Sequence, residues 1–288
     1  MRHGLSPALR AKWDALIATE GNRLGISGCR AFLENKLVND VFYEGQFNGR
    51  PCIVKCSSRA PESILNEYEM SRRLASVDPG VCAEPLAHWR SPDGKMSFAV
   101  MQRLPGPSLT ELIARGIEMD EAIGIMEDMV RIAEALQKAG IVWRDIIPDN
   151  FLMGSDGHLK LIDAQFAIDR NAFREDPYLA SHWKYRTLLF AHHPDMAGRG
   201  WNDVAMMLHF TRGLKGNVRI EQMRDRLKGM LEAAAFPMKY GMADDVKMVL
   251  CLADLCLRRL FVHRPRKALV LKDRSARAVR FLARRAKW

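Results

Sequence analysis

The sequence has no long apolar run and no ordered set of cysteines. No stretch of eighteen consecutive apolar residues occurs, so no transmembrane helix is expected. The first seven residues lack the apolar core of a secretory signal. The six cysteines show neither the spacing of a metal site nor that of a disulfide framework. Reduced thiols in a cytoplasmic protein are therefore expected.

Excess charge is also absent from most of the chain. The net charge of +10 comes from residues 258–288, which contain twelve basic residues and one acid, Asp273. The other 257 residues carry 32 basic and 33 acidic side chains. Val279, Leu282 and Ala286 share one helical face among these arginines, which predicts a basic amphipathic helix on an anionic membrane surface. A solvated terminal helix or a disordered basic tail is the alternative. Nucleic acid is not expected as a partner, because no recognition motif accompanies the charge.

The most informative segment is 141–150, followed at a fixed distance by 161–163. Asp145 and Asn150 stand five residues apart on a short loop that contains proline, and Asp163 follows eighteen residues after Asp145 at the end of an apolar run. An acid, an amide and a second acid in this order are what phosphoryl transfer from a magnesium nucleotide requires. For each aspartate taken alone, a strand-end or turn residue is the alternative interpretation.

Two motifs carry a family resemblance. Trp143-Arg-Asp-Ile-Ile-Pro-Asp-Asn150 resembles the catalytic loop His-Arg-Asp-x-x-x-x-Asn of the protein-kinase-like fold, and Ile162-Asp163-Ala-Gln resembles its metal-binding Asp-Phe-Gly element. The resemblance covers roughly residues 33–260. It implies an α+β, two-lobed fold with a small antiparallel β lobe plus one helix and a larger helical lobe. It also implies that ATP and Mg²⁺ bind between the lobes.

The resemblance assigns a role to several residues of the large lobe. Asp145 would orient or deprotonate the acceptor hydroxyl, while Asn150 and Asp163 would hold Mg²⁺. Arg144 would support the catalytic loop. Asp203, in Trp201-Asn-Asp203, would anchor the backbone of that loop, although an acid at a helix start is the plainer interpretation.

In the small lobe, strands are predicted at 31–36, 40–47 and 51–56, with Asn48-Gly49 as the hairpin turn between the last two. Lys55 ends the third strand in Cys-Ile-Val-Lys55. This resembles the Val-Ala-Ile-Lys position, whose amine touches the α- and β-phosphates. A helix over 61–76 carries Glu67, where the family places the acid that pairs with this lysine. Glu69 is the competing choice.

The segment 97–106 resembles the last small-lobe strand and the hinge. Met101 would flank the adenine, and Gln102 and Leu104 would offer backbone C=O and N–H groups to its edge. A plain strand-to-turn junction would explain the same residues. Helices then follow from Pro107-Ser108 to about Arg115 and from 119 to 138.

These elements predict four parts of the chain. Residues 1–28 form an N-terminal helical extension, 29–102 the small nucleotide-binding lobe, 103–262 the large catalytic lobe and 263–288 the basic tail. The extension begins with a helix from Ser6-Pro7 to about Glu20. Its apolar residues share one face, so this helix is expected to pack on the body; they are Leu5, Leu9, Trp13, Leu16 and Ile17.

The turn between the first two strands departs from the family. Residues 34–40 contain no glycine where the family has Gly-x-Gly-x-x-Gly, so Asn35, Lys36 and Asn39 are expected to contribute to phosphate binding. Small-molecule and sugar kinases of this fold often lack these glycines. The absence of these glycines therefore argues more against a typical protein kinase than against the use of ATP.

Three substitutions fall within the motifs themselves. Trp143 replaces the usual histidine, and Ile147 stands where Ser/Thr kinases carry a lysine near the transferred phosphate. Gln165 replaces the glycine of Asp-Phe-Gly, so the flip of that element is less expected. The segment 163–203 has no Ala-Pro-Glu and is rich in aromatic, histidine and arginine residues, which suits acceptor recognition.

The glycine-free turn, the missing lysine, the compact chain and the basic tail together resemble bacterial lipopolysaccharide core kinases, which phosphorylate heptose or Kdo sugars. The expected reaction is transfer of the ATP γ-phosphate to a hydroxyl on such a lipid-linked glycan. The expected location is cytoplasmic, peripheral on the inner membrane. A protein Ser/Thr kinase and a catalytically silent pseudokinase scaffold are the alternatives.

Overall fold

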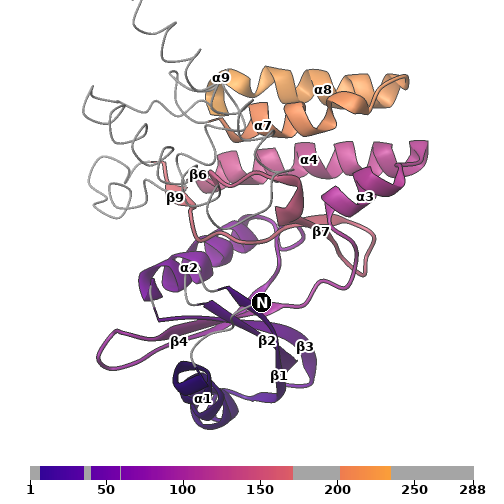
Figure 1. The fold of residues 1–288 in the computed structure, drawn as a ribbon. Coiled ribbons are helices and arrows are strands. Elements are labelled where there is room, and N and C mark those ends of the chain that lie inside the picture. The colour runs from indigo at the N-terminus through magenta and orange to yellow at the C-terminus, as the bar shows by residue number, and fades with distance from the viewer. Residues whose placement is uncertain (1–6, 36–39, 59, 171–201, 235–288) are drawn as a thin grey trace, which may run out of the picture. The chain divides into compact units, whose positions relative to one another are not determined.

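The computed structural model describes residues 7–35, 40–58, 60–170 and 202–234. All of these residues except Asn202 belong to one compact unit, which contains a five-stranded sheet and a set of helices (Figure 1). The predicted basic tail, most of the segment 163–203 and the residues Lys36 and Asn39 lie outside the described residues.

The sheet has the strand order β1-β2-β3-β5-β4, and all its pairs are antiparallel. The strands are β1 (Ile26–Asn35), β2 (Asp40–Phe47), β3 (Arg50–Ser57), β4 (Pro85–Arg90) and β5 (Ser97–Gln102). With the helices of the larger lobe, this sheet confirms the predicted α+β kinase-like fold. The turn between β2 and β3 has positive φ angles at Asn48 (50°) and Gly49 (79°), as a tight hairpin of Asn-Gly requires.

Two strands differ from the prediction. β1 begins at Ile26, five residues early, because Ile26 pairs with Phe47 and a register shift between Ser27 and Arg30 absorbs Gly28, whose φ is +63°. A glycine-containing bulge lets the chain stay in the sheet where the sequence suggests a turn. β4 was not predicted at all. It is a short edge strand that starts at a proline.

One face of the sheet is covered by helix α1 (Pro7–Leu16), which continues as a π-helical turn over Ile17–Gly21. Trp13 and Ile17 are buried against the sheet, and Leu9 and Leu16 pack at the edge of this cluster. The Tyr43 hydroxyl donates to Asp14 at 2.7 Å and fixes the helix further. The predicted packing of this face is therefore confirmed, apart from Leu5, which is not described. In Figure 1, α1 and α2 lie on opposite sides of the sheet.

The other face of the sheet carries Lys55 and packs against helix α2 (Pro61–Val77). Ile64 of α2 lies in an apolar cluster with Ala99 and Met101 of β5 and with Leu104. Alternation along β3 explains why Cys52, Val54 and Cys56 face α1 while Lys55 faces the opposite side.

The larger lobe consists of helices and short strands. The helices are α3 (Leu109–Arg115), α4 (Met119–Ala139), α7 (Asp203–Phe210), α8 (Val218–Gly229) and α9 (Leu231–Ala234), with 3-10 turns η2 (Pro148–Asn150) and η4 (Thr211–Gly213). The strands β6 (Ile141–Val142) and β9 (Ile168–Asp169) pair with each other, as do β7 (Phe151–Met153) and β8 (Leu159–Leu161). Within the described residues, no helix has the length and apolar character needed to cross a membrane.

Local sequence explains the ends of the two predicted helices in this lobe. Ser108 accepts a hydrogen bond from the backbone N–H of Glu111, and the Glu111 side chain accepts one from the backbone of Ser108. This capping box starts α3. Gly140, in the left-handed conformation, ends α4. The buried carboxylate of Asp128 on α4 accepts from the backbone N–H of Leu159 at 2.7 Å, which ties the β7–β8 hairpin to α4.

Candidate functional site

The catalytic-loop motif follows β6 and precedes β7 in the chain, and the first residue of α7 holds its backbone. The Asp203 carboxylate accepts hydrogen bonds from the backbone N–H groups of Trp143 (2.6 Å) and Arg144 (3.0 Å). Arg144 has a φ of +66°, which an L residue adopts only when its surroundings impose it. Asp203 thus fixes the backbone immediately before Asp145.

The loop brings Asp145 and Asn150 into direct contact. The Asn150 amide donates to the Asp145 carboxylate at 2.9 Å and to its backbone carbonyl at 3.0 Å. The turn η2 between them makes this possible, since it folds the five-residue spacing back on itself. The backbone carbonyl oxygen of Asn150 accepts a hydrogen bond from the backbone N–H of Ile162 at 2.9 Å, so Asn150 also lies beside the strand end that precedes Asp163.

Asp163 connects the large lobe to Lys55. The Lys55 ammonium lies 2.9 Å from Asp163 Oδ1 and 2.8 Å from Glu67 Oε2 on α2. Glu69 is exposed, so the structure places Glu67, not Glu69, against the lysine. Burial alone would lower the pKa of Lys55, but the carboxylates of Asp163 and Glu67 outweigh it and raise that pKa, which keeps the amine charged.

The charges around Lys55 fit a magnesium nucleotide. The Lys55 ammonium contacts the carboxylates of Glu67 and Asp163. The carboxylate of Asp145 is close enough to Asp163 for the charge of Asp163 to raise its pKa. Mg²⁺ is usually held by one or two carboxylates together with phosphate oxygens and water. Among the described residues, no group of three or more His, Cys, Asp or Glu side chains lies close enough together to hold a metal ion without other ligands.

The Asp145 carboxyl is tuned toward neutral pH. Its burial, followed by the nearby charge of Asp163, raises its pKa from 3.8 to about 7, while the Asn150 hydrogen bond opposes the rise. A carboxylate with a pKa near the working pH is suited to accept a proton from a hydroxyl group.

The apolar cluster beside the hinge supplies a surface suited to a nucleobase. Ala99, Met101 and Leu104 pack with Leu152 of β7 and with Ile162. Leu152 and Ile162 were not predicted from the sequence as part of this surface, although Leu152 stands two residues after Asn150 and Ile162 one residue before Asp163.

At the hinge itself, the backbone N–H of Gln102 donates to the carbonyl of Glu84 at 2.8 Å. This N–H group is therefore already hydrogen-bonded within the protein, and the predicted contact of the Gln102 C=O group with adenine stays a prediction. Leu104 is nearly buried, at 8% exposure, and its predicted N–H contact stays a prediction.

Two aromatic rings lie on β1 and β2, the strands on either side of the glycine-free turn. The ring of Phe42 on β2 lies 5.7 Å from the Lys55 amine, and Phe32 on β1 packs edge-on against Phe42 at 6.3 Å. Phe32 is 52% exposed. This pair was not predicted from the sequence, which indicated Asn35, Lys36 and Asn39 as the phosphate-binding side chains. The structure does not describe those three side chains.

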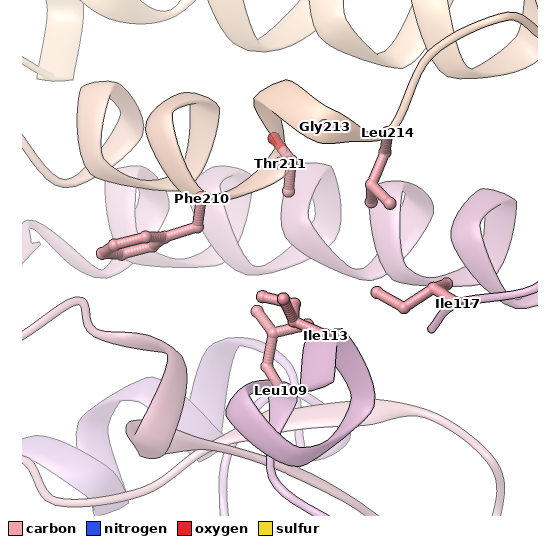
Figure 2. A pocket seen from close by; sticks show the side chains of 7 residues that line it. All are labelled: Leu109, Ile113, Ile117, Phe210, Thr211, Gly213 and Leu214. Atoms are coloured by element: carbon pink, nitrogen blue, oxygen red, sulfur yellow. The ribbon is translucent and has the colours of Figure 1, made fainter. Parts of the chain in front are cut away.

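A separate pocket of about 260 Å³ lies in the large lobe, between α3 and the turn η4 (Figure 2). Arg224 donates to the backbone carbonyls of Thr211 and Leu214 and so holds one wall in place. The wall contains no charged side chain, so this pocket lacks the groups that phosphoryl transfer needs. The residues that line it are Leu109, Ile113, Ile117, Phe210, Thr211, Gly213 and Leu214.

Comparison with known proteins finds sequence similarity to proteins that are named as kinases. The chain is 30% identical over 158 residues to casein kinase I homolog 2 of Saccharomyces cerevisiae, covering 51% of this chain and 27% of that protein. It is 26% identical over 225 residues to casein kinase I homolog 3 of Schizosaccharomyces pombe, covering 73% and 48%. It is 29% identical over 106 residues to the O-antigen chain terminator bifunctional methyltransferase/kinase WbdD of Escherichia coli, covering 36% and 15%.

These relatives are longer than the aligned region, and the chain spans about a quarter to a half of the two casein kinase I homologs. No protein-family model matches the chain. The relatives named here are kinases, and the described residues have the two-lobed α+β fold of that kind of protein.

Proposed function

We propose that this chain transfers the γ-phosphate of ATP to a hydroxyl group. The observation that carries the proposal is the placement of Lys55, which contacts Glu67 and Asp163 at once, beside the Asp145–Asn150 pair. A lysine held between a helix of the small lobe and the acid of the large lobe is the arrangement that an active phosphoryl-transfer site requires.

The roles of the residues follow from their chemistry. Lys55 binds the α- and β-phosphates, and Glu67 keeps the amine in place. Asp163 and Asn150 would supply the oxygens that hold Mg²⁺, which when bound would neutralise charge on the phosphates. The Asp145 carboxylate orients the acceptor hydroxyl and accepts its proton. Arg144 and Asp203 hold the loop that carries Asp145.

The proposed acceptor is a sugar hydroxyl on a lipid-linked glycan, of the lipopolysaccharide core class. The similarity to a protein named as an O-antigen chain terminator bifunctional methyltransferase/kinase supports a glycan acceptor. Ile147 supports it too, because Ser/Thr kinases carry a lysine at that position. The basic segment 263–288 would hold the enzyme on the anionic cytoplasmic face of the inner membrane.

A protein Ser/Thr acceptor is the second candidate. The matched kinases include casein kinase I homologs and proteins named serine/threonine-protein kinases, and these names favour it. The pseudokinase alternative is not favoured by the geometry, since Lys55, Asp145, Asn150 and Asp163 are all present and lie together.

Transfer of ³²P from γ-labelled ATP separates these possibilities. The purified chain is incubated with dephosphorylated core lipid, with lipid lacking the sugar, and with casein as a protein acceptor. We expect label in the core lipid, Mg²⁺ dependence, and loss of label with Asp163→Ala. Robust label in casein and none in the glycan would establish the second candidate instead. No label in any acceptor, with no Mg²⁺-dependent nucleotide binding, would reject the enzyme.

A further inference from the structure

We propose that Asn66 is a positioning residue that holds the metal-binding Asp163 from the side of α2. The proposal rests on the proposed function, because it concerns the same site. Asn66 immediately precedes Glu67 on α2, and its side chain contacts the turn 164–167 that follows Asp163. The family motifs give no signal for this residue.

The turn 164–167 is held through its backbone carbonyls. The Asn66 amide donates to the carbonyls of Ala167 at 2.9 Å and Gln165 at 3.1 Å, with a longer contact of 3.4 Å to Ala164. The remaining carbonyl, that of Phe166, accepts from Arg144 Nε at 2.5 Å. The carbonyls of residues 164–167 are thus contacted by two side chains, Asn66 from the small lobe and Arg144 from the large lobe.

This restraint is needed because Asp163 has a φ of +65°. An L residue other than glycine reaches the left-handed region only when its surroundings compensate for the strain. The hydrogen bonds to the residues immediately after Asp163 supply such a restraint. They fix the backbone from which the Asp163 carboxylate extends toward Lys55.

Asn66 also couples two parts of the site that are distant in sequence. Neighbouring positions of α2 hold the Lys55 amine through Glu67 and the Asp163 turn through Asn66. A displacement of α2 would therefore break both contacts at once. Asparagine is a poor helix former in a helix interior, so the contacts with the turn, and not helix propensity, account for its presence there.

Gln165 adds a weaker contact from the turn itself. Its amide donates to Asp163 Oδ2 at 3.4 Å, and its side-chain oxygen lies 3.4 Å from the Lys55 amine. Together with the Lys55 contact on Oδ1, this fixes the rotation of the Asp163 carboxylate. The glycine of Asp-Phe-Gly could not do so, since it has no side chain.

The test measures Mg²⁺ binding to the ADP-saturated full chain, followed by thermal shift, so no acceptor is needed. Residues that orient a metal ligand from outside the coordination sphere typically contribute 10- to 100-fold to metal affinity. We expect Asn66→Ala to raise the Mg²⁺ concentration at half-maximal shift at least about tenfold. Asn66→Asp should raise it more, because its carboxylate would face the carbonyl oxygens of the turn. Glu69→Ala, an exposed change on the same helix, is the control.

Unfolding in urea without ligand is measured in parallel. If Asn66→Ala proves unstable, Asn66→Ser, which retains one donor, replaces it with the same expected direction. A lower urea midpoint with an unchanged Mg²⁺ midpoint would overturn the proposal, since it would show a purely structural role. A wild-type chain without any Mg²⁺-dependent shift would instead reject the proposed function, and with it this inference.

Discussion

Asp145→Asn should make the protein more stable at alkaline pH while it abolishes phosphoryl transfer. The folded state raises the Asp145 pKa from 3.8 to about 7. A raised pKa means that the folded state binds the proton more tightly than the unfolded chain. The associated stability is fully present below about pH 4 and is lost as the pH rises through 7.

The magnitude follows from the shift. About three pKa units correspond to about 4 kcal/mol, at about 1.4 kcal/mol for each unit. Between pH 5 and pH 8, ionisation of this carboxyl in the folded state lowers the free energy of unfolding by roughly 2.5 kcal/mol. Asparagine cannot titrate and can still accept the hydrogen bond from Asn150, so the variant should lack this part of the pH dependence.

Urea unfolding of both proteins at pH 5, 6, 7 and 8 measures the difference directly. The free energy of unfolding of Asp145→Asn, relative to wild type, should rise across this range by roughly 2.5 kcal/mol. Asp149→Asn, an exposed change in the same turn, serves as the matched control and should follow wild type. Parallel pH profiles for wild type and Asp145→Asn would refute the conclusion that partial burial and the charge of Asp163 raise the pKa of this carboxyl.

Two further perturbations test other parts of the account. Glu67→Gln should lower kcat/KM for ATP by at least about tenfold, because it removes the charge that holds Lys55, whereas Glu69→Gln should have little effect. Steady-state kinetics at varied ATP check this, and equal losses for both variants would contradict it. Trp13→Ala should lower the free energy of unfolding by about 3–5 kcal/mol, since Trp13 is fully buried between α1 and the sheet. Urea unfolding measures it, and a loss under about 1 kcal/mol would mean that α1 does not stabilise the sheet.

Much of the fold could be predicted because its signals are local. Asn48-Gly49 determines a hairpin by its own backbone preferences, and the apolar face around Trp13 predicts a packed helix. β4 and the start of β1 could not be predicted in this way. Their place in the sheet depends on pairing with distant strands, and Gly28 reads as a turn until Phe47 is known to lie opposite Ile26.

The candidate site was likewise predicted only in part. Motif spacing indicated Lys55, Glu67, Asp145, Asn150 and Asp163, and the structure brings these five side chains together; their roles stay predictions. Asn66 and Phe42 were missed because their importance arises from what they contact in space. An asparagine inside a helix has no distinctive pattern until the carbonyls of the turn 164–167 are seen against it. The raised pKa of Asp145 likewise depends on burial, which spacing does not report.

Calorimetric titration of the full chain with a non-hydrolysable ATP analogue, with and without Mg²⁺, tests the central claim most directly. We predict binding that requires Mg²⁺ and is lost with Asp163→Ala, because Asp163 and Asn150 would supply the protein ligands of the metal. Binding that persists unchanged without Mg²⁺ and in Asp163→Ala, or no binding at all, would contradict it.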